Sequence, residues 1–276
     1  MARRNKLRGA EEKTMTNSNV LILTDIEGIS GVDSIEAVSQ DSQKYADACE
    51  RLMIDTNIAV AALIEAGADT VFVLDGHGKG DNFIREKLSP NAEQIAISDL
   101  SWVIKDISCV VLVGMHAMSG TVNAFLDHTQ SSLKIHNYFY NGKRIGEISQ
   151  IGTFAGYFGV PCVAVTGDSA ACREAKELID GVFTASVKTA RGRNHAECIP
   201  TDEATARIYS AVHDGFIGAA GIKPMKVTLP LTVTVEFNRS DYCDEALIND
   251  PSLHRADAFT ATSVKTEIKA YKDVLL

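Results

Sequence analysis

Four short apolar runs, each ending at polar residues that can bind a metal, constrain the fold of this chain more than any other feature. The runs begin at residues 20, 71, 110 and 160, and they lead into Thr24-Asp25-Ile26-Glu27-Gly28, Asp75-Gly76-His77, Gly114-Met115-His116 and Thr166-Gly167-Asp168. Short β-branched runs bounded by glycine are typical of buried parallel strands. Open α/β sheets bind ligands at the carboxyl ends of such strands. The pattern therefore predicts that Asp25, Glu27, His77 and His116 lie at one edge of one sheet.

The segments between and after these runs indicate the fold class. Apolar residues at helical spacing predict helices over residues 43–66, 146–157, 170–179 and 201–215. From residue 226 the pattern alternates, which predicts half-buried strands over 227–237 and 259–265 and a closing helix over 266–276. We therefore expect an α/β fold with a Rossmann-like, mostly parallel sheet flanked by helices and a smaller α+β C-terminal part.

The same change of pattern predicts the domain organisation. Residues 1–19 are polar and basic and lack the apolar segment of a secretory signal, so we expect a disordered extension in which Met15 is an alternative start. Residues 20–190 are expected to form the α/β metal-binding catalytic domain. Residues 191–276 are expected to form a smaller α+β domain that serves oligomerisation.

Composition excludes several classes of partner. Acidic residues outnumber basic ones 36 to 27, for a formal charge of −9, which argues against nucleic acid or an anionic membrane surface as a partner. We find no apolar run of the ~20 residues that a membrane-spanning helix needs. The six cysteines form no C-x-x-C pair, so we expect buried, reduced thiols and a cytoplasmic protein.

The polar residues at the strand ends point to a metal centre. Asp25 and Glu27 are two residues apart, so in extended chain they face the same side. Two such carboxylates repel each other unless a cation separates them. His77 and His116 follow equivalent strand ends, and Glu147 adds a third carboxylate at a predicted helix start. This set exceeds the needs of one tetrahedral zinc and suits two divalent metals that share a carboxylate. The alternative is an unrelated acidic pair, two loop histidines and a carboxylate at a helix N-terminus.

Other polar residues have two interpretations each. His128 follows the His116 loop and is either an exposed loop histidine or a general acid/base and oxyanion stabiliser beside the metals. Lys188, Arg191 and Arg193 form a basic cluster. The cluster is either solvated surface or a site for a substrate carboxylate or a neighbouring subunit, with Lys188 and Arg193 as the candidate substrate-binding residues. Asp168 is expected to cap the helix that follows it.

Seven motifs occur in order between about residues 20 and 272, and together they carry a resemblance. They are Asp25-Ile26-Glu27-Gly28 with Ile29-Ser30-Gly31, Asp75-Gly76-His77, Gly114-Met115-His116, Gly146-Glu147, Gly167-Asp168, Ala185-Ser186-Val187-Lys188 and Val235-Glu236-Phe237. In this combination the chain resembles the zinc-dependent D-aminopeptidases of bacterial dipeptide-transport operons, a family of self-compartmentalising metallopeptidases.

The resemblance implies a cofactor, a site and an assembly. Its implied ligands for two zinc ions per subunit are Asp25, Glu27, His77, His116 and Glu147, with Asp25 bridging. His128 corresponds to a histidine with a catalytic role. A ring-based decamer with its sites facing an inner chamber is also implied. Carboxylate and imidazole ligands also accept Mn²⁺ or Co²⁺.

These observations predict a metal-dependent hydrolase that cleaves amide bonds of small substrates. The most specific hypothesis is an aminopeptidase (an amidohydrolase in the broad sense) acting on D-amino-acid peptides or amides through a dinuclear zinc-activated hydroxide. Departures from the family pattern at Thr24, at Gly76 and around His128 motivate an alternative. That alternative is an amidase on a non-peptide amide, such as a cyclic or N-acyl catabolic intermediate. A second alternative is a non-catalytic binding protein.

Overall fold

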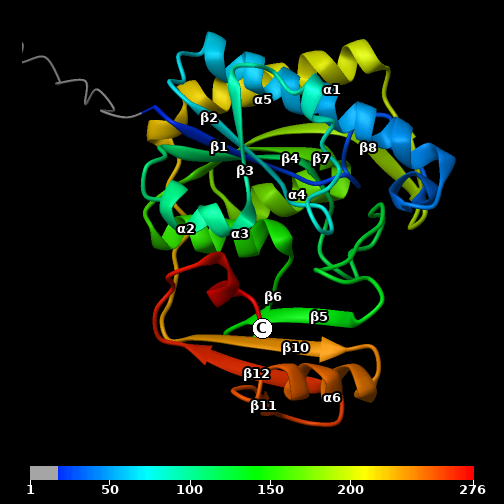
Figure 1. The fold of residues 1–276 in the computed structure, drawn as a ribbon, viewed down its shortest axis with the longest axis vertical. Coiled ribbons are helices and arrows are strands. Elements are labelled where there is room, and N and C mark those ends of the chain that lie inside the picture. Colours follow the sequence, from blue (N-terminus) through cyan, green and yellow to red (C-terminus); the bar gives the residue numbers. More distant parts are fainter. Residues whose placement is uncertain (1–17) are drawn as a thin grey trace, which may run out of the picture.

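The computed structural model describes residues 18–276 and places two β-sheets in separate layers (Figure 1). The larger sheet has seven strands, and their spatial order is β3 (Ala92–Ile95), β2 (Val71–Asp75), β1 (Val20–Thr24), β4 (Cys109–Met115), β7 (Cys162–Asp168), β8 (Phe183–Gly192) and β9 (His195–Cys198). The smaller sheet has five strands, and their order is β11 (His254–Arg255), β12 (Thr260–Lys265), β10 (Leu231–Phe237), β5 (Ile135–Tyr140) and β6 (Lys143–Arg144).

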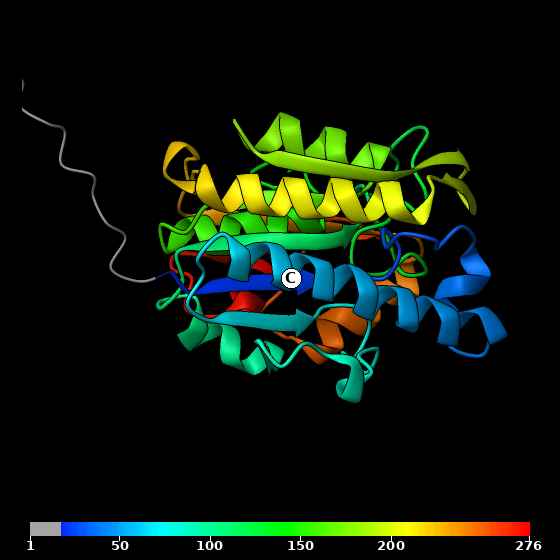
Figure 2. The same ribbon diagram turned by 90° about the horizontal axis from the view of Figure 1, so that it is seen from above.

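Helices cover both faces of the larger sheet. Helices α1 (Gln43–Glu65) and α5 (Thr201–Ile217) lie side by side on one face (Figures 1 and 2). On the opposite face lie α2 (Leu100–Val103), α3 (Glu147–Tyr157) and α4 (Ser169–Leu178), and this face is turned toward the smaller sheet (Figure 1). Helix α6 (Ser240–Asn249) packs on the smaller sheet. The predicted α/β fold with a mostly parallel sheet and a smaller second part is therefore confirmed.

Strand register explains why the predicted site residues meet. Strand β1 pairs in parallel with both β2 and β4, and Thr24 at its end lies opposite Asp75 and Val113. All residues of these three strands are buried, as their continuous apolar sequences predict. The chain therefore leaves the three strands at one level, at the carboxyl edge of the sheet.

The structure differs from the sequence-based elements in three places. The closing helix predicted over 266–276 is wrong, because only Tyr271–Val274 forms a short 3₁₀ turn. The Asp273 carboxylate accepts hydrogen bonds from the backbone N–H groups of Lys269 and Ala270, at 2.8 and 2.9 Å, which competes with helical bonding. The β8–β9 hairpin and helix α6 are two elements that the sequence analysis does not include.

The two layers draw on interleaved stretches of the chain. Strands β5 and β6, residues 135–144, belong to the smaller sheet, whereas β9 and α5 follow residue 190 and belong to the larger layer. The division at residue 190 and the oligomerisation role stay predictions. Of the predicted extension, residues 1–17 lie outside the described residues. Ser18 and Asn19 are described and hydrogen-bond to Asp69 and Asp106.

Two further expectations concern cysteines and membranes. All six cysteines are free; five are buried and Cys198 is partly exposed. In the part of the chain from residue 18 onward, we find no helix with the length and apolarity that membrane crossing requires.

Gly114 locks the end of β4 against the segment that follows β1. Its φ is +78°, and a Cβ added there would lie 2.2 Å from the carbonyl oxygen of Asp25. Its own carbonyl accepts a 2.8 Å hydrogen bond from the N–H of Gly28. Glycine therefore allows the close approach of two backbones that bring the strand ends together.

We expect Gly114→Ala to lower the free energy of unfolding by about 2–5 kcal/mol, the sum of a left-handed backbone and an overpacked contact. Gly67→Ala is the matched control, because Gly67 has φ +96° but a Cβ added there would meet no heavy atom within 4 Å. The free energy of unfolding of Gly67→Ala should fall only by the contribution of the left-handed backbone, about 1–2 kcal/mol. Chemical denaturation measures both values, and equal losses would contradict the role of close approach.

Candidate metal centre

The structure brings together the six residues predicted for the centre. Asp25 and Glu27 follow β1, His77 follows β2, and His116 follows β4. Glu147 is the first residue of α3, and His128 lies in the loop between β4 and β5. The segment after β1 is fixed locally. The N–H of Asp25 donates to Val113 O at 2.8 Å, and Asp25 Oδ1 accepts from the N–H of Ile26 at 2.8 Å.

Asp25 lies between two imidazoles, each of which also faces a second carboxylate. Its Oδ1 is 3.0 Å from His77 Nδ1, and its Oδ2 is 3.2 Å from His116 Nε2. His77 Nδ1 is also 3.0 Å from Glu27 Oε2, and His116 Nε2 is 3.4 Å from Glu147 Oε1. The centre therefore consists of two imidazole–carboxylate groups that share Asp25.

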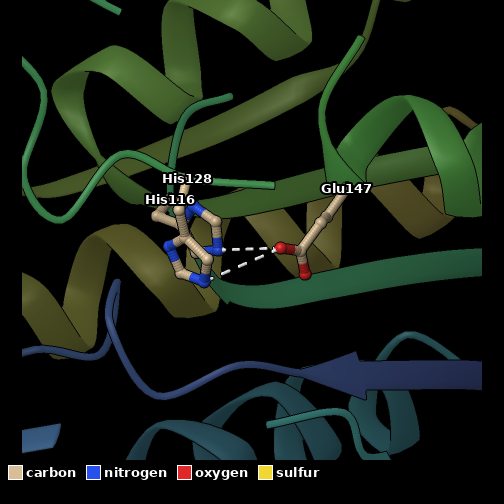
Figure 3. Close-up of side chains that lie close together, drawn as sticks. All are labelled: His116, His128 and Glu147. Atoms are coloured by element: carbon tan, nitrogen blue, oxygen red, sulfur yellow. Dashed lines mark ion pairs between the residues drawn. The ribbon is translucent and has the colours of Figure 1, made fainter. Parts of the chain in front are cut away.

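Backbone carbonyls set the tautomers of two histidines. His116 Nδ1 lies 3.0 Å from Ala117 O, and His128 Nδ1 lies 2.8 Å from Leu126 O. A carbonyl only accepts, so each Nδ1 carries the hydrogen, and in the neutral ring each Nε2 has a free lone pair. The two rings stack with centroids 3.9 Å apart, and both Nε2 atoms face Glu147 (Figure 3).

The charges of the centre are strongly coupled. Burial by itself lowers the pKa of His77, but the Glu27 and Asp25 carboxylates outweigh burial and raise this pKa to about 11. Burial also opposes protonation of His116, yet Glu147 and Asp25 raise its pKa well above the usual value. Burial alone raises the pKa of Asp25, but the imidazoles of His116 and His77 hold it well below its usual range. The carboxylates therefore stabilise positive charge at the centre, and either protons on the histidines or metal cations can supply that charge.

Two buried atoms at the centre lack hydrogen bonds. Within residues 18–276, Glu27 Oε2 and His116 Nε2 are both buried and neither has a partner in hydrogen-bond geometry. Such atoms in a polar site are typical of ligands to an ion. Ligand atoms at the vertices of a zinc tetrahedron are about 3.3–3.6 Å apart, given metal–ligand distances of about 2.0–2.2 Å. The spacings of 3.2 and 3.4 Å around His116 Nε2 are close to that range.

Two overlapping groups of residues could each hold a metal ion, because within each group the ligand atoms all lie within 4.8 Å of one another. One consists of Asp25, Glu27 and His116, and the other of His116, His128 and Glu147. The donor set therefore fits a divalent cation. The ligand and catalytic roles of the individual residues stay predictions.

A network that the sequence analysis did not single out holds the His77 loop. The Asp75 carboxylate accepts from the N–H and side-chain amide of Asn82, at 2.6 and 2.9 Å, and from the N–H of His77 at 3.3 Å. The Asn82 amide also donates to His77 O at 2.8 Å, and Tyr45 donates to Asn82 Oδ1. Asp75 precedes Gly76-His77 directly, which is the sequence signal that marks it.

Comparison with known proteins identifies the family. A family model described as D-aminopeptidase matches residues 19–275. The chain belongs to the D-aminopeptidase family. A D-aminopeptidase of Bacillus subtilis (strain 168) is 25% identical over 258 residues, which cover 91% of this chain and 93% of the relative. The family assignment and the enzyme class predicted from the motifs are therefore confirmed.

A solved structure shares the fold. It is the B. subtilis protein DppA, described as a Zn-dependent D-aminopeptidase and a self-compartmentalizing protease. It aligns with this chain with a TM-score of 0.87 and 23% identity, and covers 93% of this chain and 95% of its own. The D-aminopeptidase fold therefore extends over nearly the whole described chain.

The three members of the basic cluster lie in different environments. Arg193 is exposed, and its guanidinium contacts Asp127 through Nε at 3.4 Å from a carboxylate oxygen. Arg191 is exposed and pairs with Glu197. Lys188 is buried, and its Nζ donates to Glu27 O and Val32 O, both at 2.6 Å. This geometry gives Lys188 contacts with the backbone of Glu27 and Val32, and it leaves Arg193 at the surface beside the loop that carries His128.

Asp168 caps α4 as expected. Its Oδ1 accepts from the N–H of Ala171 at 2.9 Å, and its Oδ2 accepts from the N–H of Phe125 at 3.2 Å. The second bond was not foreseen, and it ties the end of β7 to the loop that carries His128.

Proposed function

We propose that this protein is a dinuclear zinc aminopeptidase that removes D-amino acids from small peptides or amides. The observation that carries the proposal is the position of Asp25, whose two carboxylate oxygens face two different histidines, the half-buried His77 and the buried His116. Each histidine faces one further carboxylate, Glu27 or Glu147. The arrangement suits two cations with Asp25 as the shared ligand. The name of the B. subtilis relative agrees with D-amino-acid substrates, and the description of the solved structure agrees with zinc.

The chain's own residues would perform distinct tasks around the bound metals. Zinc ions held here would supply an acidified water and a Lewis acid for the scissile carbonyl. His116 and His77 have to be neutral to bind them, so binding releases the protons that the carboxylates otherwise hold on these rings. Asp25, Glu27 and Glu147 together offset the added positive charge.

His128 is the residue placed to move a proton. Its Nδ1–H is held by Leu126 O, so Nε2 is the atom that exchanges protons. This Nε2 lies 3.8 Å from Glu147 Oε1 and 4.0 Å from Glu27 Oε1. We assign it the protonation of the leaving amine or stabilisation of the developing oxyanion.

A cavity beside His128 is our candidate for the substrate pocket. Its volume is about 340 Å³, and His128, Asp127 and Arg193 contribute to its lining. This size suits a small ligand. We assign Arg193 the predicted role of binding a substrate carboxylate, which a guanidinium recognises well.

The proposal includes an assembly and a compartment. We propose a ring-based homodecamer of cytoplasmic subunits, in line with the self-compartmentalizing relative. The smaller layer exposes large apolar side chains that would suit subunit contacts. They include Ile248, Phe259 and Val264, which are 76%, 49% and 56% exposed.

A substrate screen on zinc-loaded and chelator-treated protein tests the proposal. We expect D-alanyl dipeptides and D-alanine amide to be hydrolysed at least about 100-fold faster than their L counterparts, a difference of about 2.7 kcal/mol. Chelation should abolish the activity and added zinc should restore it. Preferential cleavage of lactams or N-acyl amides would favour the amidase instead. Protein that retains no metal after dialysis and hydrolyses nothing would contradict an enzymatic role.

A further inference from the structure

Lys188 on β8 is a buried ammonium whose partners are backbone groups. Its relative exposure is 1%. Among the described residues, it has no carboxylate within ion-pair distance. Its Nζ donates instead to the carbonyls of Glu27 and Val32 and lies 5.0 Å from the centre of the Phe125 ring. Burial of a cation is costly unless its hydrogens are used, so this environment calls for an explanation.

The two carbonyls mark the ends of one short segment, residues 27–32, which we call the ligand loop. Lys188 contacts both ends of this loop, and the first end is the backbone of the candidate ligand Glu27 itself. The middle of the loop is held by Asp55 of α1. Its carboxylate accepts from Ser30 N–H at 2.8 Å and from Ser30 Oγ at 2.6 Å. The ligand loop is therefore held by side chains of both β8 and α1.

The same ammonium lies against the loop that carries His128. Phe125 is fully buried, and its N–H donates to Asp168 at the end of β7. The next residue, Leu126, has φ +48°, a conformation that side chains of its kind rarely adopt. Surrounding contacts have to hold such a backbone in place. One of them is the 2.7 Å bond from Leu126 N–H to Arg193 O.

We propose that Lys188 is a positioning residue of the metal centre, which fixes the Glu27 backbone and supports the His128 loop through Phe125. The inference rests on the proposed metal-dependent function. It explains why a lysine is present here: its ammonium supplies several donors to two converging carbonyls at the end of a slender chain. A methionine would fill the same space but leave both carbonyls without a donor.

Zinc affinity, measured by competition with a chromogenic chelator, tests the proposal. We expect Lys188→Met to weaken at least one of the two zinc sites about 10- to 100-fold, the usual effect of removing an outer-shell partner. Lys188→Gln keeps an NH₂ group with two N–H donors, so it should weaken zinc binding less than Lys188→Met does. Tyr140→Phe is the matched control. It removes a buried donor to Val274 O in the smaller layer, so its zinc affinity should equal that of the parent.

Thermal unfolding of the metal-free variants separates positioning from general stability. The melting temperatures of Lys188→Met and Tyr140→Phe should be lowered by similar amounts, while only the former loses zinc affinity. Zinc affinity of Lys188→Met within twofold of the parent would overturn the proposal. Failure of both Lys188 variants to fold would also overturn it, since Lys188 would then act on the whole fold. A parent protein that binds no zinc would instead refute the proposed function.

Discussion

Asp25→Asn should remove bound metal and amide hydrolysis together. The substitution keeps the size of the side chain but loses the negative charge that the imidazoles of His77 and His116 share. An amide presents one oxygen and a donor nitrogen, so it cannot serve two cations. We expect the metal content to fall from about two ions per chain to fewer than one. We expect kcat/KM to fall by about 10³-fold or more, equivalent to about 4 kcal/mol.

Elemental analysis after dialysis and a steady-state assay measure the two losses. Asp241→Asn on α6 is the control, because it makes the same change of charge at an exposed residue of the smaller layer. Full zinc content in Asp25→Asn, or undiminished hydrolysis, would show that the carboxylate is not a shared ligand.

His128→Gln should reduce turnover while leaving the metals in place. The ring stacks on His116 and directs Nε2 toward Glu147 and Glu27, but its assigned role is proton transfer. Loss of a general acid costs about 10²–10⁴-fold in kcat. We expect KM and zinc content to change little.

The matching control is His213→Gln on α5. This histidine also stacks on an aromatic ring, that of Tyr209, and it is not one of the residues of the centre. It should retain the parent's kcat and zinc content. If His128→Gln loses zinc as well as turnover, His128 is a ligand rather than an acid/base. If its kcat matches that of the parent, the assigned role fails.

Much of the candidate centre followed from the sequence because strand ends are easy to predict. Buried parallel strands need continuous apolar residues, and a glycine or a charged residue ends them. Once β1, β2 and β4 are aligned in register, Asp25, His77 and His116 have to meet. Glu147 followed from a helix start, which is also a local signal.

The rest of the molecule depends on contacts between distant residues. The sequence around Lys188 indicated a basic surface cluster, but the chain places it beneath Glu27, 161 residues away. Nothing local distinguishes a buried lysine from a solvated one until its partners are known. The same holds for the Asp273 contacts that replace the expected closing helix. It also holds for the pairing of β5 with β10, in which residues as far apart in the sequence as Tyr140 and Val233 lie opposite each other.

Asp25 is proposed to lie between two metal ions, and anomalous diffraction at the zinc absorption edge tests this position most directly. Crystals of zinc-loaded protein should show two peaks per chain, one contacted by Asp25, Glu27 and His77 and the other by Asp25, His116 and Glu147. A single peak, or two peaks of which Asp25 contacts one at most, would contradict the central claim.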